Sequence, residues 1–150
     1  MTVSIRDARM ADADVIAEFN ACIADETENL RLDRGTLDSG VRKLLADPTL
    51  GRYWVAESNG EIVGQIMTTF EWSDWRDGTL WWIQSVYVRT DQRRRGIFSQ
   101  LYAHVERLAQ TSADVVGLRL YVEKDNKRAQ GTYRKLGMTM TDYKVMQELF

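Results

Sequence analysis

Residues 79–99, which read TLWWIQSVYVRTDQRRRGIFS, decide the fold. The apolar, aromatic-rich run over 79–88 predicts a buried strand. A polar and basic stretch follows it, and Gly96 then permits a tight turn or a close approach of the backbone to another group. Apolar residues recur at helical spacing after Gly96, which predicts a helix over 97–110. The segment is therefore a strand, a glycine-containing turn and a helix in direct succession.

The rest of the chain continues this alternation of strands and helices. Apolar patterning predicts strands over residues 2–7, 52–57, 61–70 and 116–122, a final strand or pair of strands over 138–147, and helices over 11–24, 36–47 and 126–136. Asn59-Gly60 separates two of these strands and is the strongest two-residue hairpin signal. The order βααβββαβαβ predicts an α/β protein with one domain over residues 1–150, in which helices flank a mixed central sheet.

Length and composition exclude several classes of protein. The 150 residues suffice for a domain with its own core, and the 44% of hydrophobic residues argues against disorder. The formal charge of −2 disfavours a nucleic-acid partner. The single cysteine, Cys22, and the single histidine, His104, give no basis for a metal site, and we expect none. We see no apolar run that resembles a signal peptide or a membrane span, and we expect a cytoplasmic protein.

Three consecutive arginines, Arg93, Arg94 and Arg95, precede Gly96 in the turn. Backbone N–H groups and the positive end of a helix dipole meet at such a turn, an arrangement suited to a pyrophosphate. Guanidinium groups can add pairing with phosphate oxygens. A solvated run of arginines is the alternative interpretation. The motifs G-x-x-x-x-G-K-[ST] and G-x-G-x-x-G, which would indicate other nucleotide sites, do not occur in the sequence.

Two segments resemble motifs of one enzyme superfamily. Residues 93–98 read RRRGIF, and residues 126–138 read NKRAQGTYRKLGM. They are similar to the patterns [QR]-x-x-G-x-[GA] and N-x-x-A-x-x-x-Y-x-K-x-G-[FM] of the GCN5-related N-acetyltransferase (GNAT) superfamily. Phe98 stands where the family has Gly or Ala, and we expect its ring to point away from the pyrophosphate into the core. The resemblance implies the GNAT acyl-CoA N-acyltransferase fold and acetyl transfer from acetyl-CoA to an amine.

The resemblance also implies where acetyl-CoA would bind. Backbone N–H groups of residues 93–99 would hold the pyrophosphate, and the backbone of Val86 and Val88 would pair with the pantetheine arm. A backbone N–H near Val86 or Tyr87 would polarise the acetyl oxygen. The cofactor-binding residues expected on this basis are Val86, Tyr87, Val88, Arg93, Arg94, Arg95, Gly96, Ile97, Phe98, Ser99, Asn126 and Ala129.

Tyr133 would be the acid that protonates the departing CoA thiolate. A phenol suits this role because its ordinary pKa of ~10 lies above the ~8.5 of a thiol. A core tyrosine is the alternative. The base is open, because Ile83 occupies the position where some relatives carry a glutamate. Glu26, Glu28 and Glu71 are the candidates for that role; the alternatives are that each is a plain surface carboxylate and that a water chain to backbone carbonyls removes the proton.

Tryptophan is concentrated near the expected acceptor side, where Trp72, Trp75, Trp81 and Trp82 all fall. Their rings could bind a small cationic amine by cation–π contact, with Glu26 and Glu28 adding attraction. The alternative is that these rings cover the sheet or a homodimer interface. The function expected is transfer of an acetyl group to a primary amine of a small molecule. The alternatives are a protein N-terminal or lysine acetyltransferase and a non-catalytic acyl-CoA-binding domain.

Overall fold

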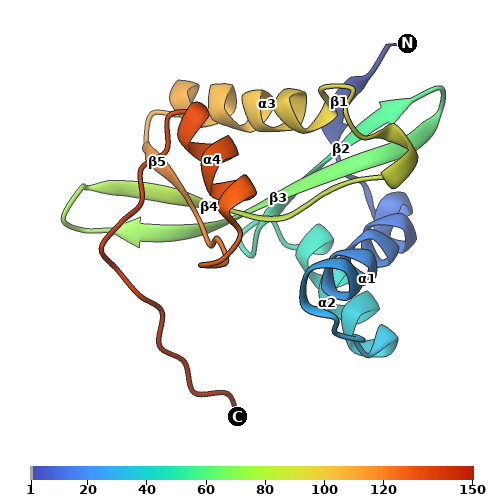
Figure 1. Cartoon of the computed structure of the whole chain (residues 1–150), viewed down its shortest axis with the longest axis horizontal. Helices are drawn as coiled ribbons and strands as arrows, with labels where there is room; N and C mark the ends of the chain where they lie inside the picture. Colours follow the sequence, from blue (N-terminus) through green and yellow to red (C-terminus); the bar gives the residue numbers. More distant parts are fainter. Residues whose placement is uncertain (1) are drawn as a thin grey trace. The chain divides into compact units, whose positions relative to one another are not determined.

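The computed structural model describes residues 2–150, which fall into two compact units, one ending at Leu120 and the other spanning Tyr121–Phe150 (Figure 1). The first unit contains β1 (Ser4–Asp7), α1 (Ala13–Glu28), α2 (Arg34–Ala46), β2 (Arg52–Ser58), β3 (Glu61–Ser73), β4 (Gly78–Val88), α3 (Ile97–Thr111) and β5 (Val115–Leu120). Short 3-10 turns, η1 (Met10–Asp12) and η2 (Thr90–Gln92), precede α1 and α3. The second unit contains α4 (Lys127–Lys135).

The five strands form one mixed sheet in the order β1-β2-β3-β4-β5. Neighbours from β1 to β4 run antiparallel, whereas β4 and β5 run parallel. Asn59 and Gly60 connect β2 to β3 with φ angles of 52° and 76°. Two positive φ angles are what the favoured two-residue hairpin turn requires. The predicted hairpin and the predicted α/β class with a mixed sheet are both confirmed.

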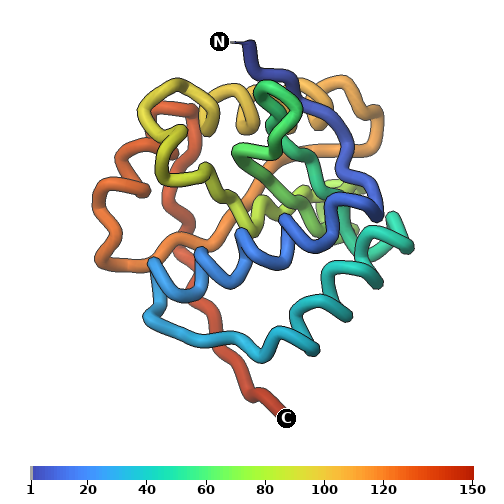
Figure 2. The backbone as a smooth tube through the Cα atoms, turned by 90° about the vertical axis from the view of Figure 1, so that its right-hand side faces the viewer, coloured from blue at the N-terminus to red at the C-terminus, as the bar shows by residue number. Residues whose placement is uncertain are grey.

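Helices cover both faces of the sheet in the first unit, with α1 and α2 on one face and α3 on the other (Figures 1 and 2). On the first face, Ile16 of α1 and Val41 of α2 join Val55 and Met67 in a buried cluster. On the second face, the fully buried Trp54 lies 6.2 Å from the His104 ring of α3. Both helix layers therefore bury the apolar stripe that their sequences present.

The edge between β4 and β5 opens part-way along β4. The parallel ladder runs from Thr79↔Val115 to Ile83↔Leu120 and ends there. The second half of β4 continues to pair with β3, up to Gly64↔Val88. Beyond Ile83, one edge of β4 is thus outside the ladder with β5.

The predicted final strand over residues 138–147 is wrong, because residues 138–150 form neither helix nor strand. The apolar side chains of this segment, among them Met140, Tyr143 and Val145, are exposed. The two-residue period breaks between Met140 and Tyr143, so neither face of an extended segment would be uniformly apolar. A strand without an apolar face has little to gain from packing on a core. Among residues 2–150, no helix has the length and apolar character needed to cross a bilayer.

Candidate active site

A β-bulge interrupts β4 just beyond the end of its ladder with β5. The register with β3 passes from Gln65↔Tyr87 to Met67↔Gln84, so Ser85 and Val86 together lie opposite one residue. Ser85 takes a φ of 51°, in the left-handed region that few residues other than glycine adopt. A bulge re-aims the backbone groups of the extra residue away from the regular ladder. An extended ligand could pair with backbone groups along this open edge, as an added strand does.

The turn into α3 combines left-handed backbone with a helix start. Gly96 is the N-cap of α3 with a φ of 77°, and Arg94 has a φ of 65°. In the described chain, the N-cap of α3 has no side-chain hydrogen bond. The first N–H groups of a helix have no partner within the helix, and the helix dipole places positive charge there. These are the properties expected of a pyrophosphate cradle at residues 93–99.

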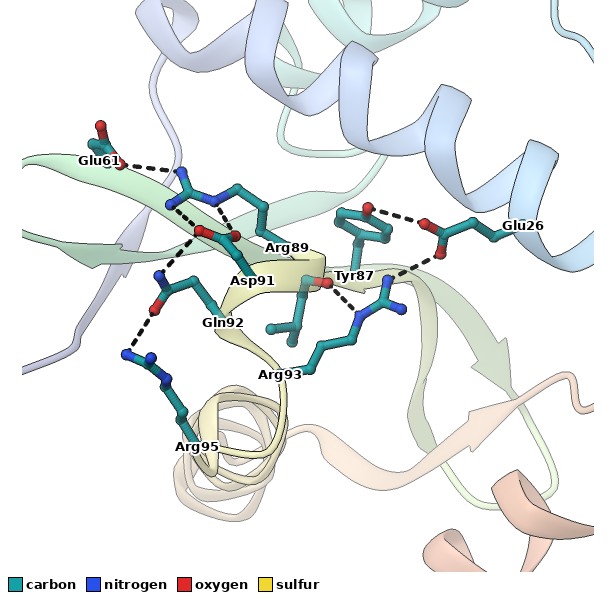
Figure 3. A network of polar contacts seen from close by, with 9 residues as sticks. Glu26, Glu61, Tyr87, Arg89, Asp91, Gln92, Arg93 and Arg95 are labelled. Carbon is teal, nitrogen blue, oxygen red and sulfur yellow. Dashed lines mark hydrogen bonds and ion pairs between the residues drawn. The ribbon is translucent and has the colours of Figure 1, made fainter.

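Two side chains of the arginine run, Arg93 and Arg95, are directed to different partners (Figure 3). Arg93 forms an ion pair with Glu26 at 2.9 Å and donates from Nε to the Val88 carbonyl at 2.9 Å. Arg95 donates to the Gln92 side chain at 3.5 Å, and Arg94 is exposed. The Glu26 carboxylate raises the pKa of Arg93. The charge of Arg93 is therefore already matched within the protein.

Glu26 connects α1 to β4 and to the turn. Its Oε1 accepts a hydrogen bond from Tyr87 at 3.2 Å, while its Oε2 pairs with Arg93. Burial, helped by Cys22 and Glu26, raises the pKa of Tyr87 to about 12. The Tyr87 ring also lies 4.9 Å from that of Phe19. Tyr87 is consequently a protonated, packed residue, and both oxygens of Glu26 are occupied.

A second chain of contacts holds the 3-10 turn that follows β4. Arg89 pairs with Glu61 at 3.1 Å and with Asp91 at 2.7 Å (Figure 3). The Gln92 amide donates to Asp91 at 3.3 Å. These bonds attach the turn to the start of β3. They therefore hold in place the residues from which the backbone continues to Gly96.

Glu71 belongs to a different polar cluster, on the α1/α2 face of the sheet but farther along β3 than Met67, which packs against those helices. Its Oε1 accepts from the Trp82 indole at 2.9 Å, and its Oε2 lies 3.3 Å from Arg119. Gln84 donates to Thr69 at 2.7 Å on the same face. The structure therefore separates Glu71 from Glu26, and it leaves Glu28 exposed at the end of α1.

The four clustered tryptophans do not form one wall. Trp81 is buried, with its ring 6.1 Å from that of Trp54, whereas Trp82 bonds to Glu71 on the opposite face. Successive residues of a strand face opposite sides, so Trp81 and Trp82 cannot line the same surface. Trp72 alternates with Glu71 and is 62% exposed, and Trp75 is 88% exposed in the hairpin turn. A pocket lined by all four is thus wrong.

Phe98 does not enter the core. It is half-buried at the start of α3, with its ring 6.3 Å from that of Tyr102. Its neighbour Ile97 is the residue that becomes fully buried. The helical phase explains the difference, because the core-facing stripe of α3 passes through Ile97, Leu101 and Val105.

In the second unit, Asn126 caps α4 as the sequence predicts. Its side-chain oxygen accepts from the Ala129 backbone N–H at 3.0 Å. Gln130 donates to the carbonyls of Glu123 and Lys124, at 3.1 and 2.9 Å, and so ties the helix to the preceding loop. Tyr133 lies on α4, and burial raises the pKa of its phenol. The catalytic and cofactor roles of Asn126, Ala129 and Tyr133 stay predictions.

Sequence reasoning missed Gln65, which holds the bulge. Gln65 is fully buried, and its amide donates to the Ser85 carbonyl at 3.0 Å and to Asn20 at 2.9 Å. The signal was present in residues 62–67, IVGQIM, where a single amide interrupts an apolar strand. A buried amide is seldom placed in a core without hydrogen-bond partners.

Residues 16–138 match the acetyltransferase (GNAT) family. The chain belongs to that family. A solved structure described as a possible acetyltransferase from Clostridium difficile 630 is 45% identical, with a TM-score of 0.94 over 100% of this chain and 99% of the other. A second, from Clostridium acetobutylicum and described as a predicted acetyltransferase with acetyl-CoA, shares the fold at 20% identity, with a TM-score of 0.81 over 98% and 96% of the two chains. The predicted GNAT fold is confirmed.

Two curated relatives extend the comparison. An acetyltransferase of Pectobacterium atrosepticum is 35% identical over 67% of this chain, and the match spans 65% of that relative. The L-methionine sulfoximine/L-methionine sulfone acetyltransferase of Pseudomonas aeruginosa is 29% identical over 94% of this chain and 83% of its own length. The family and these relatives support acetyl-CoA-dependent N-acetyltransferase activity for this GNAT chain.

Proposed function

We propose that this acetyltransferase modifies a primary amine of a small molecule and takes acetyl-CoA along the open edge of β4 and the start of α3. The observation that carries the proposal is the bulge at Ser85 and Val86, followed along the chain by the left-handed Gly96 at the N-cap of α3. The bulge frees backbone groups for a thioester and its pantetheine arm. The uncapped helix start supplies N–H groups for a pyrophosphate. Both parts therefore recognise the donor through main-chain atoms.

The chain's own groups have distinct tasks in the reaction. The neutral amine nitrogen forms a bond to the thioester carbonyl carbon and loses one proton to solvent, from which Tyr133 is later reprotonated; the C–S bond breaks, and CoA leaves as a thiolate. A backbone N–H at Val86 or Tyr87 stabilises the negative charge that develops on the carbonyl oxygen. Tyr133 gives its phenolic proton to the thiolate. The raised pKa of Tyr133 keeps that proton in place until the thiolate forms.

The acceptor is proposed to approach the face of the sheet that carries Glu71. The partly exposed Glu71 carboxylate bonds to the Trp82 indole and pairs with Arg119, and an ammonium group would share this carboxylate with Arg119. The Pseudomonas aeruginosa relative is named for L-methionine sulfoximine and L-methionine sulfone, which are small primary amines. Glu26, Glu28 and Trp72 stay predictions for the acceptor, and Glu26 is the least available of them because Arg93 and Tyr87 occupy it. A cytoplasmic location and a homodimer are also part of the proposal.

Release of free CoA from acetyl-CoA in the presence of different acceptors tests the proposal. The panel contains L-methionine sulfone, L-methionine sulfoximine, an aminoglycoside, a peptide with a free N-terminal alanine and a peptide with an internal lysine. Turnover of at least one small amine, well above that of both peptides, supports the proposal. Preference for a peptide would overturn the acceptor class. If the donor site is as described, acetyl-CoA at 100 times its Kd raises the free energy of unfolding by about 2.7 kcal/mol, and no stabilisation would refute the donor site.

A further inference from the structure

A network of buried and half-buried polar side chains contacts the bulge in β4. Gln65 of β3 donates to the Asn20 side chain of α1 at 2.9 Å and to the Ser85 carbonyl at 3.0 Å. Asn20 also donates to the Tyr53 hydroxyl of β2 at 2.9 Å. Burial raises the pKa of Tyr53, while hydrogen bonds with Asn20 and with the Ser85 side chain oppose that rise. Side chains from α1, β2 and β3 thus form one network, and its Gln65 holds the Ser85 carbonyl of β4.

The contribution of Gln65 to the stability of the fold does not by itself explain why an amide occupies this position. Gln65 is fully buried, and its Oε1 has no hydrogen-bond partner among the described residues. An amide oxygen buried without a partner destabilises the folded state. An apolar side chain of the same length, such as methionine, would fill the space and leave no such atom. The reason for an amide at this position therefore lies in the two groups to which its N–H groups donate, the Ser85 carbonyl and the Asn20 side chain.

The Nε2 group holds a strained residue. The φ of Ser85 is 51°, and a residue with a Cβ is unfavourable in the left-handed region. Such a residue persists only where its surroundings over-determine it, and this occurs preferentially at functional sites. Without the bond from Gln65 to its carbonyl, Ser85 can relax towards negative φ. Relaxation would rotate the next peptide group, which carries the Val86 N–H.

We propose that Gln65 is a positioning residue for acetyl transfer. Its amide fixes the Ser85–Val86 bulge in the conformation that aims a backbone N–H at the carbonyl oxygen of the acetyl group. The inference rests on the proposed function, because it places the thioester at this bulge. A hydrogen bond to the developing oxyanion depends on geometry, so loss of the anchor lowers turnover more than it lowers cofactor binding.

The test compares Gln65→Met with wild type, and Thr68→Val is the matched control. Thr68 lies on the same strand, is equally buried and has an unpartnered hydroxyl, but it sits on the opposite face, across from Ile83. Calorimetry gives the Kd of acetyl-CoA and of CoA, and CoA release with the best small amine of the panel gives kcat. For Gln65→Met we expect kcat to fall by about 10- to 100-fold, as small misplacement of catalytic groups does. The Kd of CoA stays unchanged, while the preference for acetyl-CoA over CoA falls. Thr68→Val keeps all three values.

Ser85→Gly supplies the rescue that separates positioning from packing. Glycine adopts the left-handed conformation without the Cβ penalty, so the bulge no longer needs its anchor. In the Gln65→Met background, Ser85→Gly is expected to raise kcat about 5- to 30-fold, up to the wild-type value, which is the factor that corresponds to the conformational penalty removed. A loss of general packing would not respond to this change. If Gln65→Met does not fold, Asn20→Leu removes the other hydrogen bond of the Gln65 amide and is expected to lower kcat in the same way, to a smaller extent.

The outcomes separate the two proposals. Wild-type protein that neither binds acetyl-CoA nor turns over any amine refutes the proposed function. An active wild type with an equally active, folded Gln65→Met variant refutes only the role of Gln65. An inactive Gln65→Met variant that also loses CoA affinity, and is not rescued by Ser85→Gly, likewise overturns it. If Asn20→Leu is tested instead, a kcat equal to that of the wild type overturns the role of Gln65.

Discussion

Replacement of Gly96 by alanine isolates the left-handed turn at the start of α3. Gly96 has a φ of 77°, and a Cβ added there would meet no described atom within 4 Å outside its immediate neighbours. No steric clash therefore adds to the conformational penalty, which is roughly 1–2 kcal/mol for a residue with a Cβ in this region. If the turn keeps its shape, the free energy of unfolding falls by that amount. If the turn relaxes in the free protein, the same amount is lost from acetyl-CoA binding, as about a 5- to 30-fold rise in Kd.

Measurements of stability and of acetyl-CoA binding together therefore test the predicted total loss of free energy. Urea unfolding gives the change in stability, calorimetry gives the change in acetyl-CoA Kd, and the two losses should sum to about 1–2 kcal/mol. Gly40→Ala is the control, because Gly40 lies within α2 and its added Cβ also meets nothing within 4 Å. There the same substitution should raise stability by up to about 1 kcal/mol, since alanine favours helix over glycine. Stabilisation by Gly40→Ala together with no change of either kind in Gly96→Ala would refute a left-handed cradle.

Three further predictions concern the acid, the acceptor and pH. Tyr133→Phe should lower kcat by about 100-fold or more and leave the acetyl-CoA Kd unchanged in calorimetry; an active variant would exclude Tyr133 as the acid. Glu71→Gln should raise the acceptor KM by about 10-fold, the scale of one charged hydrogen bond, without changing the KM of acetyl-CoA, and an unchanged acceptor KM would place the amine elsewhere. The hydrogen bond from Arg6 lowers the pKa of the buried Asp12 below its ordinary value. The unfolded state therefore binds the proton more readily, so this stability is full above about pH 4 and is lost as pH falls further. Urea unfolding between about pH 6 and about pH 3 should show a shallower decline for Asp12→Asn than for wild type, and equal slopes would contradict it.

Sequence patterns predicted the elements that bury a periodic apolar stripe. The stripe of α3 and the Asn59-Gly60 turn are local signals, and the structure confirms both. The strand predicted over residues 138–147 is wrong because the alternation breaks between Met140 and Tyr143, which leaves the segment without a uniformly apolar face. The tryptophan segment failed for a related reason, since Trp81 and Trp82 are adjacent and a strand sends them to opposite faces.

The bulge and its anchor could not be predicted from the sequence. A bulge is a property of the register between two strands. The sequence patterns of residues 61–70 and 79–88 are compatible with strand pairing both with and without a bulge. The bond from Gln65 to the Ser85 carbonyl joins residues on neighbouring strands, and the bond to Asn20 reaches into α1. The pairing of Arg93 with Glu26 joins residues 67 positions apart. Long-range contacts of this kind set the charge state and the conformation of the site.

Left-handed backbone marks the same region independently of any motif. Five non-glycine residues of the described chain have positive φ, and Asn29, Asn59 and Asp77 among them are of the types that tolerate it in turns and helix ends. The other two are Ser85 and Arg94, at the bulge and in the turn before Gly96. Ser85 and Arg94 are residue types that seldom adopt positive φ, so their backbone is strained. Both lie along the backbone path proposed for acetyl-CoA, one at each end. A site that recognises its ligand with main-chain atoms depends on the residues that fix φ, so Phe98, in place of the Gly or Ala of the family pattern, is compatible with the cradle we propose.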